Sequence, residues 1–187
     1  MRERLQRTGE IMKSRLAAGL LAAGIALAIS AATALPTAAA TTGSETVNGR
    51  LVTSGVSGTR TAISSVAVAR GVFNGVGRIV EIPAQPGDPP NVSRDDLVYP
   101  VGTMHLVNTT VGASISVNPH NCLFRATLQE DSQITGGTGL FAHASGTFTG
   151  TISPQGLLPR NPDGSCAAGK PSLHEVDFVT FSGTLSF

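Results

Sequence analysis

The chain has 187 residues, with 13 lysine or arginine residues against 12 aspartate or glutamate residues, and it has no tryptophan. A near-neutral chain with scattered charges lacks the basic surface that nucleic acids and anionic lipids require. Both are therefore excluded as expected partners.

The first forty residues have the composition of a secretory signal peptide. Five basic residues precede an uncharged run of Leu, Ala, Gly and Ile over residues 16–29, and Ala38-Ala39-Ala40 follows. This order of basic, apolar and small residues is typical of a cleaved leader. The uncharged stretch is also long enough to span a bilayer, but Pro36 interrupts it. We predict cleavage of residues 1–40 and export to the extracellular space, with no stable membrane span after cleavage. The start codon stays open between Met1 and Met12.

Cleavage would leave about one domain of chain. Eight basic and ten acidic residues remain, so the excess of basic residues belongs to the leader. Residues 41–60 are rich in Thr, Ser and Gly, and we predict a flexible N-terminal arm there, with one early strand near residues 47–52 left open. The folded domain is expected over residues 61–187.

Two cysteines, Cys122 and Cys166, lie in the mature part of the chain. An even number of cysteines in an exported domain favours a disulfide over a metal site or a catalytic thiol. We predict a Cys122–Cys166 bridge, with two free thiols as the alternative.

The mature chain has the pattern of an all-β domain. No helix-length window has apolar residues at helical spacing, whereas period-two alternation with β-branched residues recurs throughout. Val111, Ala113, Ile115 and Val117, for example, predict one half-buried strand. Strands are expected over residues 61–70, 71–82, 97–107, 111–117, 123–133, 147–153 and 176–187, with Pro- and Gly-rich loops over 83–96 and 154–171.

Seven or eight short antiparallel strands with no helix to cover them must close on themselves or pair with a second sheet. Glycines such as Gly150 and Gly183 suit the corners of a closed barrel. We predict an eight-stranded antiparallel β-barrel, with a sandwich as the alternative.

A glycine cluster lies within the run Ile134-Thr-Gly-Gly-Thr-Gly-Leu-Phe-Ala-His-Ala-Ser-Gly. Glycine reaches positive φ at no steric cost, so Gly136, Gly137 and Gly139 predict a sharp turn, with Phe141 as a plug beneath it. The run resembles the GGTGxFxxAxG signature of dirigent proteins and allene oxide cyclase-like barrels. From about residue 66 the chain is similar to small secreted bacterial barrels of that superfamily. The resemblance implies an eight-stranded, calycin-like antiparallel barrel and assigns no catalytic residue.

Four residues are candidates for ligand contact. Tyr99 is the single tyrosine, and His105 is expected to share its face. His143 follows the glycine turn at the expected barrel rim. Arg125 lies on the polar face of its strand, which is either the solvated outside or a polar lumen.

The densest group of ionisable residues is His174-Glu175-Val176-Asp177. We interpret it as the solvated start of the last strand, with proton transfer by a carboxylate as the alternative. The four histidines of the chain lack the spacing of metal ligands, so neither a metal nor another cofactor is predicted.

Two classes of function follow from these patterns. The first is a secreted, non-catalytic barrel that binds a small apolar molecule or serves as a surface or interaction domain. The second, implied by the resemblance, is an allene oxide cyclase-like isomerase or cyclase, or a dirigent-like auxiliary protein that steers another enzyme's product. A lumen with at least two converging polar groups and a buried carboxylate or histidine would favour the enzyme, and a fully packed lumen would exclude both ligand-based functions. No pattern in the sequence sets the oligomeric state.

Overall fold

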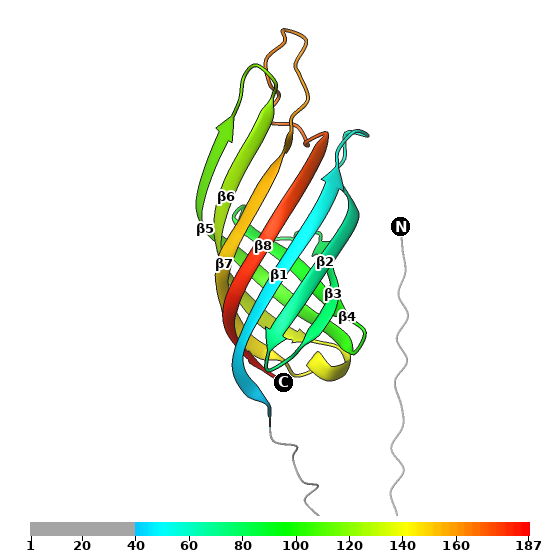
Figure 1. The fold of residues 1–187 in the computed structure, drawn as a ribbon, viewed down its shortest axis with the longest axis vertical. Helices are drawn as coiled ribbons and strands as arrows, with labels where there is room; N and C mark the ends of the chain where they lie inside the picture. Colours follow the sequence, from blue (N-terminus) through cyan, green and yellow to red (C-terminus); the bar gives the residue numbers. More distant parts are fainter. Residues whose placement is uncertain (1–39) are drawn as a thin grey trace, which may run out of the picture. The chain divides into compact units, whose positions relative to one another are not determined.

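The computed structural model describes residues 40–187, so residues 1–39 of the predicted signal peptide lie outside it. Eight antiparallel strands form one closed barrel, in which each strand pairs with the next and β8 returns to β1 (Figure 1). The prediction of an all-β, eight-stranded antiparallel barrel is confirmed. The strands are β1 (Thr42–Ser54), β2 (Thr61–Gly71), β3 (Gly75–Ile82), β4 (Val92–Tyr99), β5 (Gly102–Val117), β6 (Leu123–Gly137), β7 (Ser145–Leu157) and β8 (His174–Ser186).

Strand β1 shows that the prediction of a flexible arm over residues 41–60 was wrong. It pairs with β2 along one edge and with β8 along the other, so it closes the barrel. Its inward side chains include Val47, Leu51 and Thr53, all buried. The composition concealed this strand because its outward positions are polar and its inward positions include Gly49, which leaves few large apolar residues. The barrel therefore begins at β1, and residues 55–60 connect β1 to β2.

Strand β4 corrects a second boundary. Residues 92–96 were expected to belong to a loop, but they form the first part of β4, and the expected strand over 97–107 is divided by a turn after Tyr99. The acidic pair Asp95 and Asp96 produced the error, because aspartate is depleted in strands. Asp95 has Leu97 and Tyr99 as its neighbours on the same face, so its side chain faces the barrel interior.

One end of the barrel is closed by four aromatic rings. Phe141 is fully buried and contacts Phe73 edge-on, with ring centroids 5.1 Å apart. The ring centroids of Tyr99 and Phe73 are 4.9 Å apart, and those of Phe187 and Phe141 are 5.7 Å apart. Edge-to-face packing of this kind adds to the stability gained by burying the rings. The aromatic cluster therefore forms a solid floor for the barrel.

The glycine turn holds Phe141 in this floor. Gly139 has φ +57° and begins the short 3-10 helix η1 (Gly139–Phe141). A side chain at Gly137 would overlap the carbonyl oxygen of Thr103. The backbone N–H of Thr103 in turn donates to Oγ1 of Thr138 at 3.1 Å. The cluster thus fastens β6 and η1 against the β4–β5 turn, which is a structural role.

The disulfide between Cys122 and Cys166 is present, as predicted. It joins the end of the β5–β6 hairpin to the long loop between β7 and β8. Both segments extend beyond the barrel wall at the end opposite the aromatic floor (Figure 1). The bridge therefore restrains the loops that stand above the open end.

Candidate functional site

Above the aromatic floor the barrel encloses a cavity of about 350 Å³. Its apolar walls include Leu51, Leu97, Leu106, Ile152, Phe148 and Phe181. Phe148 lies opposite Gly183 and Phe181 opposite Gly150 on strands β7 and β8, so each ring covers a position that has no side chain. Cavities that hold small molecules begin at roughly this volume.

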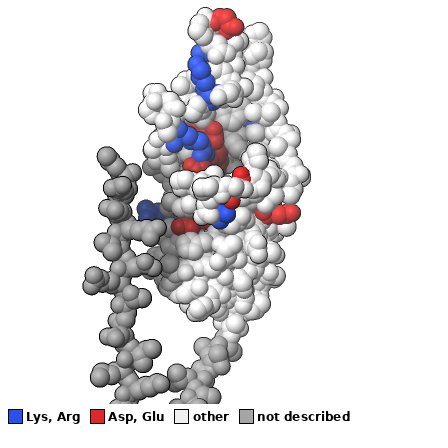
Figure 2. Space-filling model, turned by 180° about the vertical axis from the view of Figure 1, so that it is seen from behind, with Lys and Arg blue, Asp and Glu red and all other residues white. Residues whose placement is uncertain are grey.

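Five carboxylates line the same cavity as the apolar walls: Glu81 from β3, Asp95 from β4, Glu130 from β6, and Glu175 and Asp177 from β8. Their strands place them on the inner face of the barrel, toward its open end. Figure 2 shows acidic and basic side chains gathered in a recess on this side of the molecule. The site is therefore apolar at its base and acidic near its opening.

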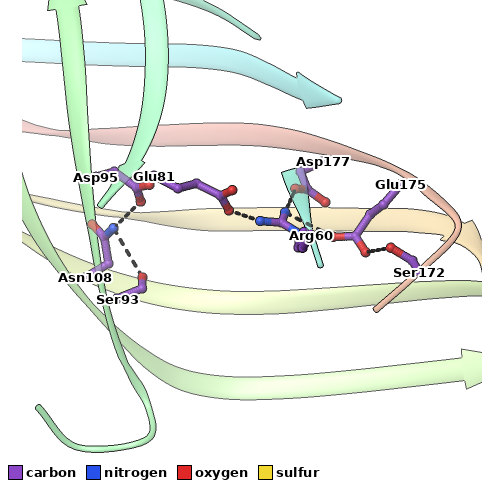
Figure 3. A network of polar contacts seen from close by, with 8 residues as sticks. All are labelled: Arg60, Glu81, Ser93, Asp95, Asn108, Ser172, Glu175 and Asp177. Carbon is purple, nitrogen blue, oxygen red and sulfur yellow. Dashed lines mark hydrogen bonds and ion pairs between the residues drawn. The ribbon is translucent and has the colours of Figure 1, made fainter. Parts of the chain in front are cut away.

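Arg60 is the hub of one half of this acidic region (Figure 3). It immediately precedes β2, and its Nη2 donates to Oδ2 of Asp177 at 2.7 Å and to Oε1 of Glu175 at 3.2 Å. Its Nη1 donates to Oε1 of Glu81. The second oxygen of Glu175 accepts a 2.6 Å hydrogen bond from the hydroxyl of Ser172. One guanidinium thus serves three carboxylates.

The other half of the acidic region is a strip across three adjacent strands, which we call the acidic strip: Asp95 of β4, Asn108 and Thr110 of β5, and Glu130 of β6. Nδ2 of Asn108 donates to Oδ2 of Asp95 at 2.7 Å, and the hydroxyl of Thr110 donates to Oε1 of Glu130 at 3.3 Å. Because β5 lies between β4 and β6, the two carboxylates flank the two neutral side chains. No basic side chain forms a hydrogen bond with either carboxylate within residues 40–187.

Two of these carboxyl groups titrate near neutral pH. Burial, together with the nearby charges of Glu81 and Glu130, raises the pKa of Asp95 to about 7, against the opposing hydrogen bond from Asn108. Burial likewise raises the pKa of Asp177 to about 7, helped by Glu175 and opposed by Arg60. The charge of Glu81 raises the pKa of both groups, so it connects the electrostatics of Asp95 with those of Asp177.

Several buried polar atoms in the cavity lack partners. Glu130 is 4 % exposed and Asp177 is 5 % exposed. Within residues 40–187, Oε2 of Glu130, Oδ1 of Asp177 and the hydroxyl of Ser132 have no hydrogen-bond partner. Burial raises the pKa of Glu130 as well. Unpartnered buried acceptors are costly to stability, so these atoms are positioned to receive hydrogen bonds from a bound molecule.

The barrel wall beside Arg60 has few backbone hydrogen bonds between its strands. Strands β2 and β3 pair at only three positions, from Ala67 to Ala69 on β2. Beyond them the hydroxyl of Ser65 donates to the carbonyl of Ile79 at 2.7 Å and accepts from its N–H at 3.1 Å. A side chain therefore replaces the backbone ladder where the strands separate. The contact of Arg60 with Glu81 joins the separated ends. A groove lined by residues 60–65 and 78–83 adjoins the cavity and shares Arg60, Ile79 and Glu81 with it.

The four candidate contact residues are not brought together, and none lines the cavity. Tyr99 lies in the aromatic floor, where burial and nearby Glu45 raise the pKa of its hydroxyl. His105 faces outward, with Nδ1 2.6 Å from Oδ1 of Asp96, because the turn after Tyr99 reverses the alternation. His143 and Arg125 are exposed on the outer surface.

The sequence did contain a signal for the acidic residues. Glu175 and Asp177, interpreted above as a solvated strand start, share the period-two face of Phe181, and that face points inward. Glu130 likewise falls on the apolar face of its strand, with Leu128. A carboxylate on the same face of a strand as its apolar residues indicates a position that faces the lumen. Arg60 precedes its strand, and no periodicity could have placed it.

Comparison with protein-family models, with curated proteins and with solved structures finds no match. The resemblance of the glycine turn to dirigent and allene oxide cyclase-like barrels therefore stays a prediction. In residues 40–187, no group of three His, Cys, Asp or Glu side chains could hold a metal ion. Within the same part of the chain, no helix has the length and apolar character needed to cross a bilayer.

Proposed function

We propose that this protein is an exported β-barrel that binds a small amphipathic molecule in its lumen. One observation carries the proposal: a cavity of about 350 Å³ that combines apolar walls with buried, unpartnered polar atoms. A barrel built only for stability would fill this volume with side chains, as small barrels do when they hold no ligand. Here the floor is packed solid while the upper lumen is open and acidic.

The proposed location is extracellular. A disulfide persists in oxidising compartments and is rare in the cytosol, so the Cys122–Cys166 bridge is compatible with export. The signal-peptide pattern of the sequence supports the same location.

An isomerase or cyclase of the allene oxide cyclase kind is the second candidate. It is favoured by the buried carboxylates that converge on the cavity, the feature named above as the mark of an enzyme. Among them Asp95 and Asp177 each have a pKa raised to about 7, which suits groups that exchange protons at neutral pH. A dirigent-like role, in which the same cavity orients another enzyme's product, uses the same volume and needs no proton transfer.

Native mass spectrometry of the protein purified from its own host tests the binding function. We expect a population with a noncovalently bound small molecule that dissociates on unfolding. The variant L106W, which fills the cavity, should lose this population, whereas V76W on the outer surface should retain it. A wild-type protein that carries no molecule and takes up none of the probes described below would refute the proposal.

Incubation of the recovered molecule with fresh protein separates binding from catalysis. A binding or dirigent-like protein returns the molecule unchanged by chromatography. An isomerase or cyclase converts it to a product of equal mass and different retention, and D95N should slow that conversion.

A further inference from the structure

Among the described residues, no basic side chain that lines the cavity is free to receive an anion. Two arginines border it, Arg60 and Arg94. Arg60 is held by three carboxylates, as described above. Arg94 lies at the rim, where its Nε and Nη2 donate to the two oxygens of Asp88 at 2.9 and 2.8 Å. An anionic ligand would therefore meet five carboxylates and two guanidinium groups that already have partners.

The acidic strip instead lacks a positive charge and a hydrogen-bond donor for one of its carboxylate oxygens. Within residues 40–187, Oε2 of Glu130 is buried without a hydrogen-bond partner, and Oδ1 of Asp177, across the cavity, is also buried without one. A hydroxyl group of a ligand could donate one hydrogen bond to such an atom, but it would not balance the buried charge. An ammonium group brings three donors together with a positive charge, so it meets both needs.

Building on the proposed function, we infer that the ligand is a small organic cation whose amine or guanidinium group binds at the acidic strip. Its apolar body would lie against Leu106 and Phe148 at the base of the cavity. Glu130 and Asp95 flank the head group from either side of β5, and Asn108 and Thr110 hold these two carboxylates in place through the hydrogen bonds described above.

The charged groups that face Asp95 set the pH dependence of this binding. In the cavity lining they are Glu81, Glu130, Glu175, Asp177, Arg60 and, at the rim and paired with Asp88, Arg94. Within the described residues, β1, β5 and β7 contribute no ionisable side chain to this lining. Protonation of Asp95 removes charge that attracts a cation, and the pKa of about 7 at this carboxyl places the change near neutrality. A bound cation favours the ionised form, so binding should strengthen from about pH 5 to about pH 8 and should release protons.

Three probes with one skeleton and different head groups test the inference: phenylbutylamine, phenylbutanol and phenylbutanoate. Titration calorimetry at about pH 8 with the host-purified protein should show the amine binding at least about tenfold more tightly than the alcohol, with the carboxylate weakest. E130Q should reduce the affinity for the amine to that for the alcohol and leave the alcohol unchanged. D131N, on the outer face of the same strand, should change neither affinity.

Each outcome separates the two proposals. Equal binding of amine and alcohol, or tightest binding of the carboxylate, would overturn the cationic ligand and leave the binding function standing. Failure of all three probes, together with a host-purified protein that carries no molecule, would overturn both. If E130Q does not fold, the wild-type pH series decides: an amine affinity that does not increase from about pH 5 to about pH 8 overturns the inference.

Discussion

The substitution D95N should stabilise the protein at alkaline pH and leave its stability at acid pH almost unchanged. Asp95 is partly buried among like charges, and its pKa rises from 3.8 to about 7 in the folded protein. A carboxyl whose pKa is higher in the folded than in the unfolded state contributes most to stability below its unfolded pKa. That contribution is lost as the pH rises through the folded value. Asparagine has nearly the same shape, can accept the hydrogen bond of Asn108 through its carbonyl oxygen, and never ionises.

The size of the effect follows from the pKa shift. A rise of about three units, at 1.36 kcal/mol each, sets an upper limit of about 4 kcal/mol for the cost of ionising Asp95 in the folded protein. The gain from D95N should therefore be near zero at about pH 4 and approach this limit above about pH 8. For a domain of this size the limit corresponds to an increase in Tm of roughly 10 °C.

Urea unfolding of wild type and D95N across this pH range measures the difference in the free energy of unfolding. Glu130 and Asp177 are present in both proteins, so the difference between the two proteins reports Asp95 together with its coupling to the neighbouring charges of Glu81 and Glu130. The control D131N removes an exposed carboxylate from the outer surface and should lack the gain above about pH 8 that D95N shows. The reasoning is refuted if the difference for D95N does not grow with pH, or if D95N is less stable than wild type at alkaline pH.

Three further predictions concern other parts of the barrel. R60A removes the cation that pairs with three carboxylates, so urea unfolding should show a free energy of unfolding lower by about 3 kcal/mol at about pH 8. The loss should be smaller near pH 4.5, and an equal loss at both pH values would contradict the ion-pair role. G139V places a side chain against a carbonyl of the β4–β5 turn at a residue whose φ is +57°, so the yield of folded protein should collapse. The control G169V, whose new side chain meets open space, should fold normally. A folded G139V that lost only ligand binding would show that the turn is functional. Reduction of the bridge between Cys122 and Cys166, which are 44 residues apart in sequence, should lower the free energy of unfolding by about 4 kcal/mol on the loop-closure model. An unchanged midpoint in urea unfolding would contradict this.

The fold could be predicted because alternation and turn chemistry are local signals. Gly139 needs a conformation that glycine adopts freely, and Phe141 follows it at a fixed distance in the chain. The alternation of Val111 with Ile115 correctly predicted a strand but wrongly predicted a half-buried face. These side chains are 59 % and 67 % exposed, because the β5–β6 hairpin extends past the barrel (Figure 1). Val117, nearer its tip, is partly buried against Phe124 and Leu158.

The site depended on which face of each strand points inward, and that is decided by closure of the whole sheet. Tyr99 and His105 were expected on one face, but a turn between them places Tyr99 in the floor and His105 outside. Glu175 and Asp177 could have been recognised from their register with apolar neighbours. Arg60 could not have been placed without the closing strand β1, which the composition of its segment concealed.

The most direct test of ligand binding in the lumen is an NMR titration of methyl-labelled protein with phenylbutylamine. Methyl groups of Leu106, Leu128 and Ile152 line the cavity, whereas those of Val66 and Val76 lie on the outer surface. We predict saturable shifts of the three cavity residues, with the two outer valines unmoved. Shifts confined to the outer valines, or no saturable shift at any of the cavity methyls, would contradict binding of the amine within the barrel, and the same result with the molecule recovered from the host would contradict lumen binding altogether.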